Sequence, residues 1–435
     1  MLVCIILLTF IHQVFMNSFQ HKLFAILITA LFFFFLAVDV TIIFRPVNRL
    51  ISPLVNALNP LHPLSEGKEG KEVFGFAPYW TFRQLDNVNF DVLTTMAYFG
   101  IPVDAEGNLV LNDPGYETFK SNYATEIFQK AHNAGTRVVL TITQMNNETI
   151  EAFVADEAAQ ENAITQTVDL VQKRGIDGIN VDFEYLGDPG PEFRQKFSKF
   201  VSKMTARMHE VEPASKVTVS VYASAVKNPK IYDINALANG SDGIFMMAYD
   251  FATTGADNAM PTSPLYGYKN GTYWYDVSTA VDDFLTQMPA DKLILGVPWY
   301  GYNYLVYEPA VKAETRPYYS WRGSPYAQTY SLASAIKPET EGVSTYKTGW
   351  DDEGKVGWKA YYLPDSGTWR MIFVEDERSL GIKYDFVKQK QLAGVGIWAL
   401  GFDDGHSEMW TTLAEKFGMK LADNNVLTKI INEQI

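Results

Sequence analysis

The segment DGINVDFE, residues 177–184, carries the pattern that decides the fold. Side chains two positions apart lie on the same face of a strand, so the apolar residues at positions 179, 181 and 183 face one way. The polar residues Asn180, Asp182 and Glu184 face the other way. Barrel interiors are normally filled by bulky apolar side chains, so consecutive polar groups there are costly unless hydrogen-bonded. The segment therefore predicts a strand that delivers polar chemistry into the centre of a parallel β-barrel.

Two carboxylates, Asp182 and Glu184, share that inward face about 7 Å apart along the strand. They cannot both ionise freely in a dry site, so one pKa should rise. We expect it to be that of Glu184, which lies at the carboxyl end of the strand, where barrel active sites are found. A carboxylic acid that stays protonated near neutral pH is a general acid for a leaving oxygen. The alternative interpretation is a satisfied polar network inside a barrel without catalytic activity.

Short β-branched and aromatic runs alternate with helical patterns beyond residue 72, as in βα units with a parallel sheet. Eight such runs are present, the number that closes a TIM (β/α)8 barrel. The expected strands are Val73–Ala77, Val92–Tyr98, Val138–Thr143, Gly178–Glu184, Val217–Tyr222, Gly243–Tyr249, Leu293–Val297 and Gly394–Ala399. The expected helices include Tyr116–Ala134, Ala158–Arg174, Pro191–Glu210 and Ser278–Gln287.

The interval from about 302 to 369, between the seventh and eighth strands, is too long for a βα loop. Alternating stretches at Val356–Tyr362 and Trp369–Val374, separated by Pro and Gly turns, predict a small α+β insertion there. An insertion at the carboxyl rim of the barrel would form one wall of a cleft.

The segment Leu23–Phe44 is apolar and long enough to cross a membrane as a helix, at about 1.5 Å per residue against a core of about 30 Å. We expect residues 1–45 to be a membrane anchor, with a cleaved signal peptide as the alternative. Met1 and Met16 are alternative starts. A linker rich in Pro and Gly should follow at 46–72, then the barrel at 73–417 and a tail at 418–435.

The overall composition narrows the class of partner. With 36 Lys and Arg against 50 Asp and Glu, the net charge is −14, and no basic cluster is present, so nucleic acid is not an expected partner. The single Cys4 cannot form an intrachain disulfide. The six histidines are scattered without metal-ligand spacing, so we expect no metal and no cofactor. We expect the protein to be a monomer.

Several motifs of the body, from about 73 to 417, resemble glycoside hydrolase family 18, the chitinase family. The segment 177–184 resembles its D-G-x-D-x-D-x-E signature, and Met247-Ala-Tyr-Asp250 resembles its M-x-Y-D motif on the sixth strand. The segments 396–401 (GIWALG), 296–301 (GVPWYG) and 375–380 (EDERSL) also look like family segments. The sequence departs from the signature at one position, because Asn180 stands where the family commonly has Asp.

The resemblance implies retaining hydrolysis in which the 2-acetamido group of the substrate is the nucleophile. Glu184 would be the general acid and base, Asp182 would orient the acetamido group, and Tyr249 would hydrogen-bond to its carbonyl oxygen. An amide at Asn180 can donate a hydrogen bond to Asp182 but cannot share a proton with it. We therefore expect Asp182 to be more firmly anionic than in the family.

Further substrate contacts are assigned to residues of the motifs and of the strand ends. Trp398, at the end of the last strand, would be the floor beneath the sugar, because an indole face packs on the apolar face of a pyranose. Asp250 would contact the same sugar or, alternatively, cap a helix. The remaining expected substrate-binding residues are Asn180, Asp177, Met247, Tyr79, Trp80 and Trp299.

Three functions remain open from the sequence. The first is hydrolysis of β-1,4 bonds at N-acetylglucosamine in chitin-like oligosaccharides or in peptidoglycan, by a membrane-anchored or secreted body outside the cytoplasm. The second is a lectin-like sugar-binding module, which the presence of Glu184 disfavours. The third is a barrel hydrolase that uses a second enzyme carboxylate, for which Asp250 and Asp403 are the candidates.

Overall fold

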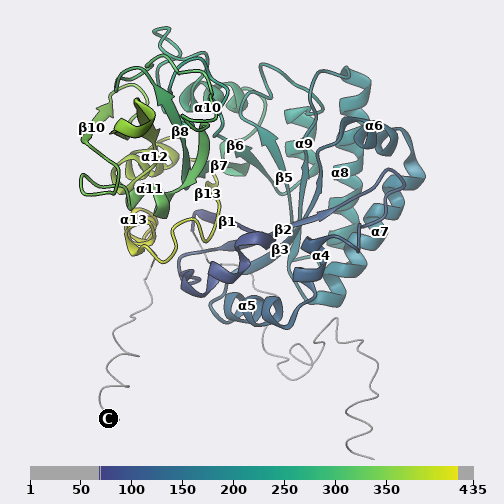
Figure 1. The fold of residues 1–435 in the computed structure, drawn as a ribbon. Coiled ribbons are helices and arrows are strands. Elements are labelled where there is room, and N and C mark those ends of the chain that lie inside the picture. Colours follow the sequence, from purple (N-terminus) through teal and green to yellow (C-terminus); the bar gives the residue numbers. More distant parts are fainter. Residues whose placement is uncertain (1–67, 69, 420–435) are drawn as a thin grey trace, which may run out of the picture. The chain divides into compact units, whose positions relative to one another are not determined.

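The computed structural model describes Lys68 and residues 70–419, which contain a closed barrel of parallel strands surrounded by helices (Figure 1). The spatial order is β1-β13-β7-β6-β5-β4-β3-β2, and β1 pairs with β2 to close the ring. The strands are β1 (Glu72–Pro78), β2 (Thr95–Pro102), β3 (Arg137–Gln144), β4 (Gly178–Phe183), β5 (Lys216–Tyr222), β6 (Gly243–Met247), β7 (Leu293–Pro298) and β13 (Gly394–Trp398). All eight expected strands and the TIM barrel are confirmed.

Helices follow most of the strands and cover the barrel from outside. They are η1 (Tyr79–Asn87), α4 (Pro114–Phe119), α5 (Asn122–Asn133), α6 (Asn147–Ala155), α7 (Glu157–Arg174), α8 (Pro191–Val211), α9 (Ile234–Gly240), α10 (Val277–Leu285), η2 (Ala290–Lys292), α12 (Glu377–Gln389) and α13 (Ser407–Phe417). The single helix expected over 116–134 is two helices. The hydroxyl of Ser121 accepts a hydrogen bond from the amide of Ala124 and starts a second helix there.

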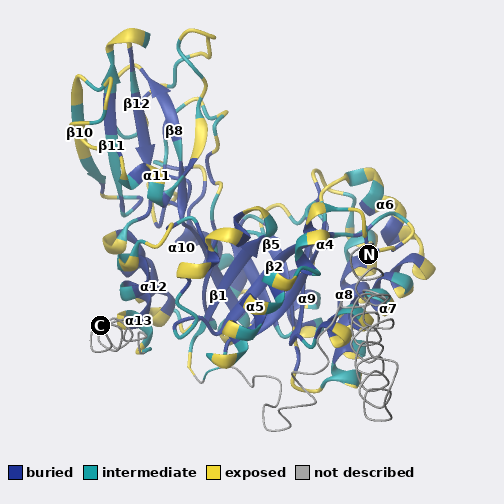
Figure 2. Ribbon diagram, turned by 60° about the horizontal axis from the view of Figure 1, so that its bottom comes forward, coloured by how far each residue is buried: buried dark blue, intermediate teal, exposed yellow. Residues whose placement is uncertain are grey.

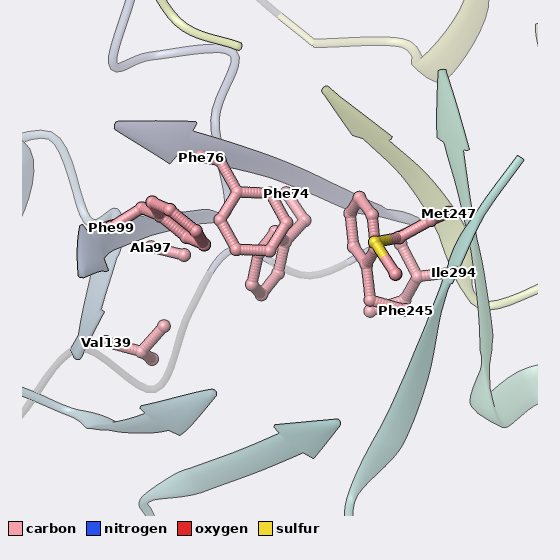
Figure 3. Packing of buried hydrophobic residues seen from close by; sticks show 8 residues of the cluster. All are labelled: Phe74, Phe76, Ala97, Phe99, Val139, Phe245, Met247 and Ile294. Carbon is pink, nitrogen blue, oxygen red and sulfur yellow. The ribbon is translucent and has the colours of Figure 1, made fainter. Parts of the chain in front are cut away.

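Aromatic side chains fill the barrel interior below the rim. Phe74 and Phe76 of β1 pack against Phe245 of β6, with ring centroids 5.4 and 4.8 Å away (Figure 3). The glycines Gly296 and Gly396 make room for that ring, because a Cβ atom at either position would lie within 2.6 Å of a Phe245 ring atom. The eight barrel strands are buried along nearly their whole length, whereas the covering helices expose their outer faces (Figure 2).

An antiparallel sheet of order β10-β11-β12-β8-β9 is inserted between β7 and β13. Its strands are β8 (Tyr300–Val306), β9 (Tyr326–Thr329), β10 (Thr345–Asp351), β11 (Val356–Leu363) and β12 (Thr368–Phe373), with the short helices α11 (Tyr330–Ser334) and η3 (Pro364–Ser366). The α+β insertion is thus confirmed, and its strands extend slightly beyond the expected limits of 302 and 369. Because β8 starts two residues after β7 ends, Tyr300 stays at the rim of the barrel.

The expected anchor and nearly all of the linker and tail lie outside the described residues. The anchor, the position of the protein at a membrane and the monomeric state therefore stay predictions. Within Lys68 and residues 70–419, every helix falls short of the length and apolarity that crossing a membrane requires.

Candidate active site

A cavity of about 160 Å³ opens at the carboxyl ends of the barrel strands. Its lining comes from β1, β4, β5, β6, β8 and β13 and from the residues just beyond them. The lining residues are Phe76, Asp182, Glu184, Ser220, Tyr222, Met247, Tyr249, Asp250, Tyr300 and Trp398. Of the eleven residues expected at the site, this cavity brings together Asp182, Glu184, Met247, Tyr249, Asp250 and Trp398.

The carboxyl groups of Asp182, in β4, and Glu184, just beyond it, both line the cavity. Burial raises the pKa of Asp182 well above its usual range, and the neighbouring Glu184 raises it further. The pKa of Glu184 is also raised by burial; a hydrogen bond with Tyr222 lowers it and the charge of Asp250 raises it. Two buried carboxyls that repel each other retain a proton at a pH where exposed ones have lost it. The pair can therefore supply a proton to a bound molecule.

Asn180 does not act on Asp182 as expected. It is fully buried, its Nδ2 donates to Ser220 Oγ at 3.1 Å, and its Oδ1 accepts from Thr218 Oγ1 at 2.8 Å. The amide is thus held by the neighbouring strand β5, outside the cavity lining. The expected hydrogen bond from Asn180 to Asp182 is thus replaced by bonds to β5, and burial and the neighbouring Glu184 raise the pKa of Asp182. Within the described chain, Asp182 Oδ1 is buried without a hydrogen-bond partner, at a residue that lines the cavity.

Tyr249 lies among the carboxylates of the cavity. Burial raises its pKa well above the usual value, and the charges of Asp182, Asp250 and Glu184 raise it further. The phenol therefore stays protonated and can donate a hydrogen bond to an oxygen of a ligand. Tyr222, which the sequence analysis did not single out, hydrogen-bonds to Glu184 and is also held protonated, because burial and Glu184 raise its pKa.

Asp250 is positioned by two tyrosines of the insertion rather than by a helix. The hydroxyls of Tyr300 and Tyr302 both donate to its Oδ1, the latter at 2.8 Å. Its backbone has φ of +57°, and its amide donates to Thr262 Oγ1 at 3.0 Å. No helix begins near it among the described residues, so the alternative of a helix cap is wrong. This carboxylate ties the insertion to the cavity.

Aromatic rings form the floor and one approach to the cavity. The ring of Trp398 packs against Phe99 and Phe76, at centroid distances of 4.8 and 5.4 Å. Trp80 of η1 is 6.4 Å from Trp398 and its side chain is 52% exposed. Trp80 and Tyr79, whose rings are 4.9 Å apart, therefore continue the aromatic surface from Trp398 toward solvent.

Three of the expected site residues lie elsewhere. Trp299 is fully buried and its ring packs 5.1 Å from that of Trp410 in α13. It is therefore a core residue, and the expectation that it contacts the substrate is wrong. Asp177 lies at the amino end of β4, away from the rim. Asp403, the candidate second carboxylate, accepts from the indole nitrogen of Trp410 at 2.9 Å and does not line the cavity. Asp250 is thus the additional carboxylate of the cavity lining.

Asp177 has a structural role that can be tested. Its buried Oδ2 accepts from the amide of Val138 at 2.7 Å and lies 2.7 Å from His132 Nε2. We expect Asp177→Asn to lower the free energy of unfolding by about 1–2 kcal/mol, because hydrogen bonds to a neutral acceptor are weaker than those to a carboxylate. Denaturant titration measures this. Activity per folded molecule should stay within about twofold of the parent, and a larger loss with unchanged stability would restore the substrate role.

The cavity contains residues that the sequence analysis missed, namely Tyr222, Tyr300, Ser220 and Phe76. The available signal was position, since Tyr222 is the last residue of the expected fifth strand and Tyr300 follows the seventh. As for metals, no group of three His, Cys, Asp or Glu side chains that would hold an ion occurs in the part of the chain that the structure describes.

A TIM barrel with a proton-retaining carboxylate pair at its rim defines the class of barrel glycoside hydrolases. The chain belongs to glycosyl hydrolases family 18, whose family model matches residues 72–403. It is thus a glycoside hydrolase.

Known proteins similar to this chain support the family assignment. Di-N-acetylchitobiase of Mus musculus is 25% identical over 332 residues, covering 69% of this chain and 86% of the relative. Chitinase A1 of Niallia circulans is 26% identical over 336 residues, covering 68% of this chain and 46% of the relative.

Solved structures share the fold. Group IV chitinase of Ostrinia furnacalis, in complex with allosamidin, superposes with a TM-score of 0.68 at 21% identity, covering 80% of this chain and 99% of that one. The spore cortex-lytic enzyme of Bacillus megaterium gives a TM-score of 0.62 at 17% identity, covering 81% and 75%.

Proposed function

We propose that this hydrolase cleaves β-1,4 bonds on the reducing side of N-acetylglucosamine residues, in chitin-type oligosaccharides or in peptidoglycan, with retention of configuration. The observation that carries the proposal is the buried pair Asp182 and Glu184, which lines one cavity together with Tyr249 and Trp398. The relatives include di-N-acetylchitobiases and chitinases, and a Cycas revoluta chitinase of the same fold was solved with (GlcNAc)3. These names support N-acetylglucosamine as the sugar at the site.

In the first step Glu184 gives its proton to the glycosidic oxygen as the bond to the anomeric carbon breaks. The carbonyl oxygen of the substrate's own 2-acetamido group attacks that carbon from the opposite face, so the ring closes to an oxazolinium ion. The leaving sugar departs as a neutral alcohol. Because the nucleophile belongs to the substrate, the enzyme needs only the one proton donor.

In the second step a water molecule replaces the leaving sugar. Glu184, now a carboxylate, takes a proton from this water as its oxygen attacks the anomeric carbon. At the same time the bond from the acetamido oxygen to that carbon breaks, which restores the neutral acetamido group. The proton taken from the water leaves Glu184 protonated for the next cycle. Two inversions at the same carbon give net retention.

Asp182 and Tyr249 stabilise the intermediate between these steps. The buried Oδ1 of Asp182, which has no partner within the described residues, is free to face the positive acetamido nitrogen. The phenol of Tyr249 donates a hydrogen bond to the acetamido oxygen. Both interactions strengthen as charge develops, which is the condition for lowering the barrier. A lectin-like binder would need none of this proton chemistry, so the raised pKa of Glu184 favours the enzyme.

The proposal is tested by the products that the full-length chain releases from chitotetraose and from purified peptidoglycan, with cellotetraose as the matched sugar that lacks the acetamido group. We expect cleavage of at least one of the first two, with the β-anomer formed first in a time-resolved NMR spectrum, and no cleavage of cellotetraose. Initial formation of the α-anomer would contradict substrate assistance. Binding of sugar without any cleavage would support the lectin alternative.

A further inference from the structure

Two lysines lie on the loop between β5 and α9, at the carboxyl rim of the barrel. Lys230 Nζ is 4.8 Å from the ring centroid of Tyr222, which lines the cavity. The charge of Lys230 lowers the pKa of Glu184, so its ammonium lies close enough to affect the catalytic pair. The rim thus carries a cation directly beside the cavity, on a chain whose net charge is −14.

Lys227 extends this positive surface along the rim. Its Nζ lies 4.7 Å from the ring of Tyr268, 5.0 Å from that of Tyr275 and 5.9 Å from that of Trp274. The indole of Trp274 donates to the carbonyl of Phe251 at 2.6 Å, next in sequence to Asp250 of the cavity. The side chain of Trp274 is 48% exposed and that of Tyr268 is 38% exposed. Apolar rings and a cation therefore face solvent together beside the site.

Neither Lys227 nor Lys230 forms an ion pair among the described residues. Within the described residues, no carboxylate lies within 4.0 Å of the ammonium of Lys227 or Lys230. By contrast, Lys269, on the neighbouring loop between β6 and α10, pairs with Asp282 at 3.5 Å. Contacts with aromatic faces orient an ammonium but leave its hydrogen-bond donors unused. The two cations are available to an acidic ligand.

The conformation of Lys230 is fixed by the loop around it. Its backbone has φ of +51°, which is unfavourable for a residue with a side chain and persists only where the surroundings impose it. Its carbonyl accepts from Arg194 Nη1 at 3.2 Å, and the Tyr232 hydroxyl donates to the carbonyl of Phe183 at 2.7 Å, which joins the loop to β4. The loop thus fixes the backbone of Lys230, and the ammonium of its side chain lies over the ring of Tyr222.

We propose that Lys230, with Lys227, binds a carboxylate carried by the substrate, so that the preferred substrate is an acidic glycan containing N-acetylglucosamine. This inference rests on the proposed function. Neutral sugar hydroxyls give an ammonium only ordinary hydrogen bonds, whereas a carboxylate gives charge-assisted ones. The rings of Trp274 and Tyr268 offer the apolar face on which the acidic sugar stacks. The lactyl group of N-acetylmuramic acid and the carboxyl group of a uronic acid are the two sources of this chemistry.

The test compares kcat and KM of the full-length chain on three tetrasaccharides. These are neutral chitotetraose, the peptidoglycan fragment of alternating N-acetylglucosamine and N-acetylmuramic acid, and the hyaluronan fragment of alternating N-acetylglucosamine and glucuronic acid. The variants are Lys230→Gln, Lys227→Gln and Lys230→Arg. Lys269→Gln is the matched control, because it removes one positive charge from the same rim at a lysine that already has a partner.

We expect Lys230→Gln to lower kcat/KM about tenfold more on the preferred acidic substrate than on chitotetraose, with the additional loss in KM. The change that both substrates share reports the effect of Lys230 on the pKa of Glu184. Lys227→Gln should have a smaller effect in the same direction. Lys230→Arg should retain most of the activity, and Lys269→Gln should behave as the parent. The acidic fragment that responds identifies the source of the carboxylate.

Equal losses on acidic and neutral substrates would overturn the proposal, since they would mean that Lys230 acts only through the pKa of Glu184. A parent enzyme that prefers chitotetraose over both acidic fragments would also overturn it, while leaving the proposed function intact. Failure of the parent to cleave any of the three would instead contradict the proposed function itself.

Discussion

Glu184→Gln lowers kcat on the preferred glycan on the order of 10³-fold, with little change in sugar binding. The amide has the shape of the acid but no proton to give to the glycosidic oxygen, and it cannot take one from water. The cavity is otherwise intact, because Asp182, Tyr249 and Trp398 remain in place. The measurement is the single-turnover rate together with the dissociation constant for a chito-oligosaccharide.

The pH profile gives the same assignment independently. Glu184 must be protonated for the first step, and burial raises its pKa. Activity should therefore persist to a higher pH than an exposed glutamic acid would allow, and fall as the pH rises through that pKa. Glu192→Gln, an identical change on the exposed start of α8, is the control and should leave both rate and profile unchanged. If Glu184→Gln retained more than a tenth of the parent activity, another group would have to be the acid.

The barrel could be predicted from sequence because its strands are buried on both faces. Such strands appear in the sequence as continuous β-branched and aromatic runs, and the presence of eight of them predicted a closed barrel. The break between α4 and α5 was missed, because apolar periodicity continues across it and only the capping side chain of Ser121 marks a new start. The insertion was found because its length exceeded that of a loop.

The site was predicted where period-two alternation and strand ends coincide, as at Asp182 and Glu184. Trp299 was misplaced because it lies between β7 and β8 and packs into the core, whereas the next residue, Tyr300, reaches the cavity. Asp177 was misplaced because a motif does not show at which end of its strand a side chain works. Tyr222 was missed because a single tyrosine in a strand is usually a core residue. Only the fold, in which β5 pairs with β4, shows that Tyr222 hydrogen-bonds to Glu184.

Asp182→Asn should lower kcat on the order of 10²-fold while leaving Glu184 in place. The amide cannot compensate the positive acetamido nitrogen, so the oxazolinium ion is less stable. The change also removes the charge that couples to Glu184. Since that coupling opposes ionisation of the pair, its loss should let Glu184 ionise more easily, and the alkaline limb of the profile should move to lower pH.

Steady-state rates measured across the pH range separate these two effects. The value of kcat at the optimum reports stabilisation of the intermediate, and the alkaline limb of the pH profile reports the ionisation of Glu184. Asp177→Asn is the matched control: the same substitution at a buried position of the same segment, but at the other end of β4. It should lose stability without moving the alkaline limb. An Asp182→Asn variant with the parent's kcat and the parent's alkaline limb would show that the two carboxyls act independently, and would contradict the inference that their mutual repulsion retains a proton.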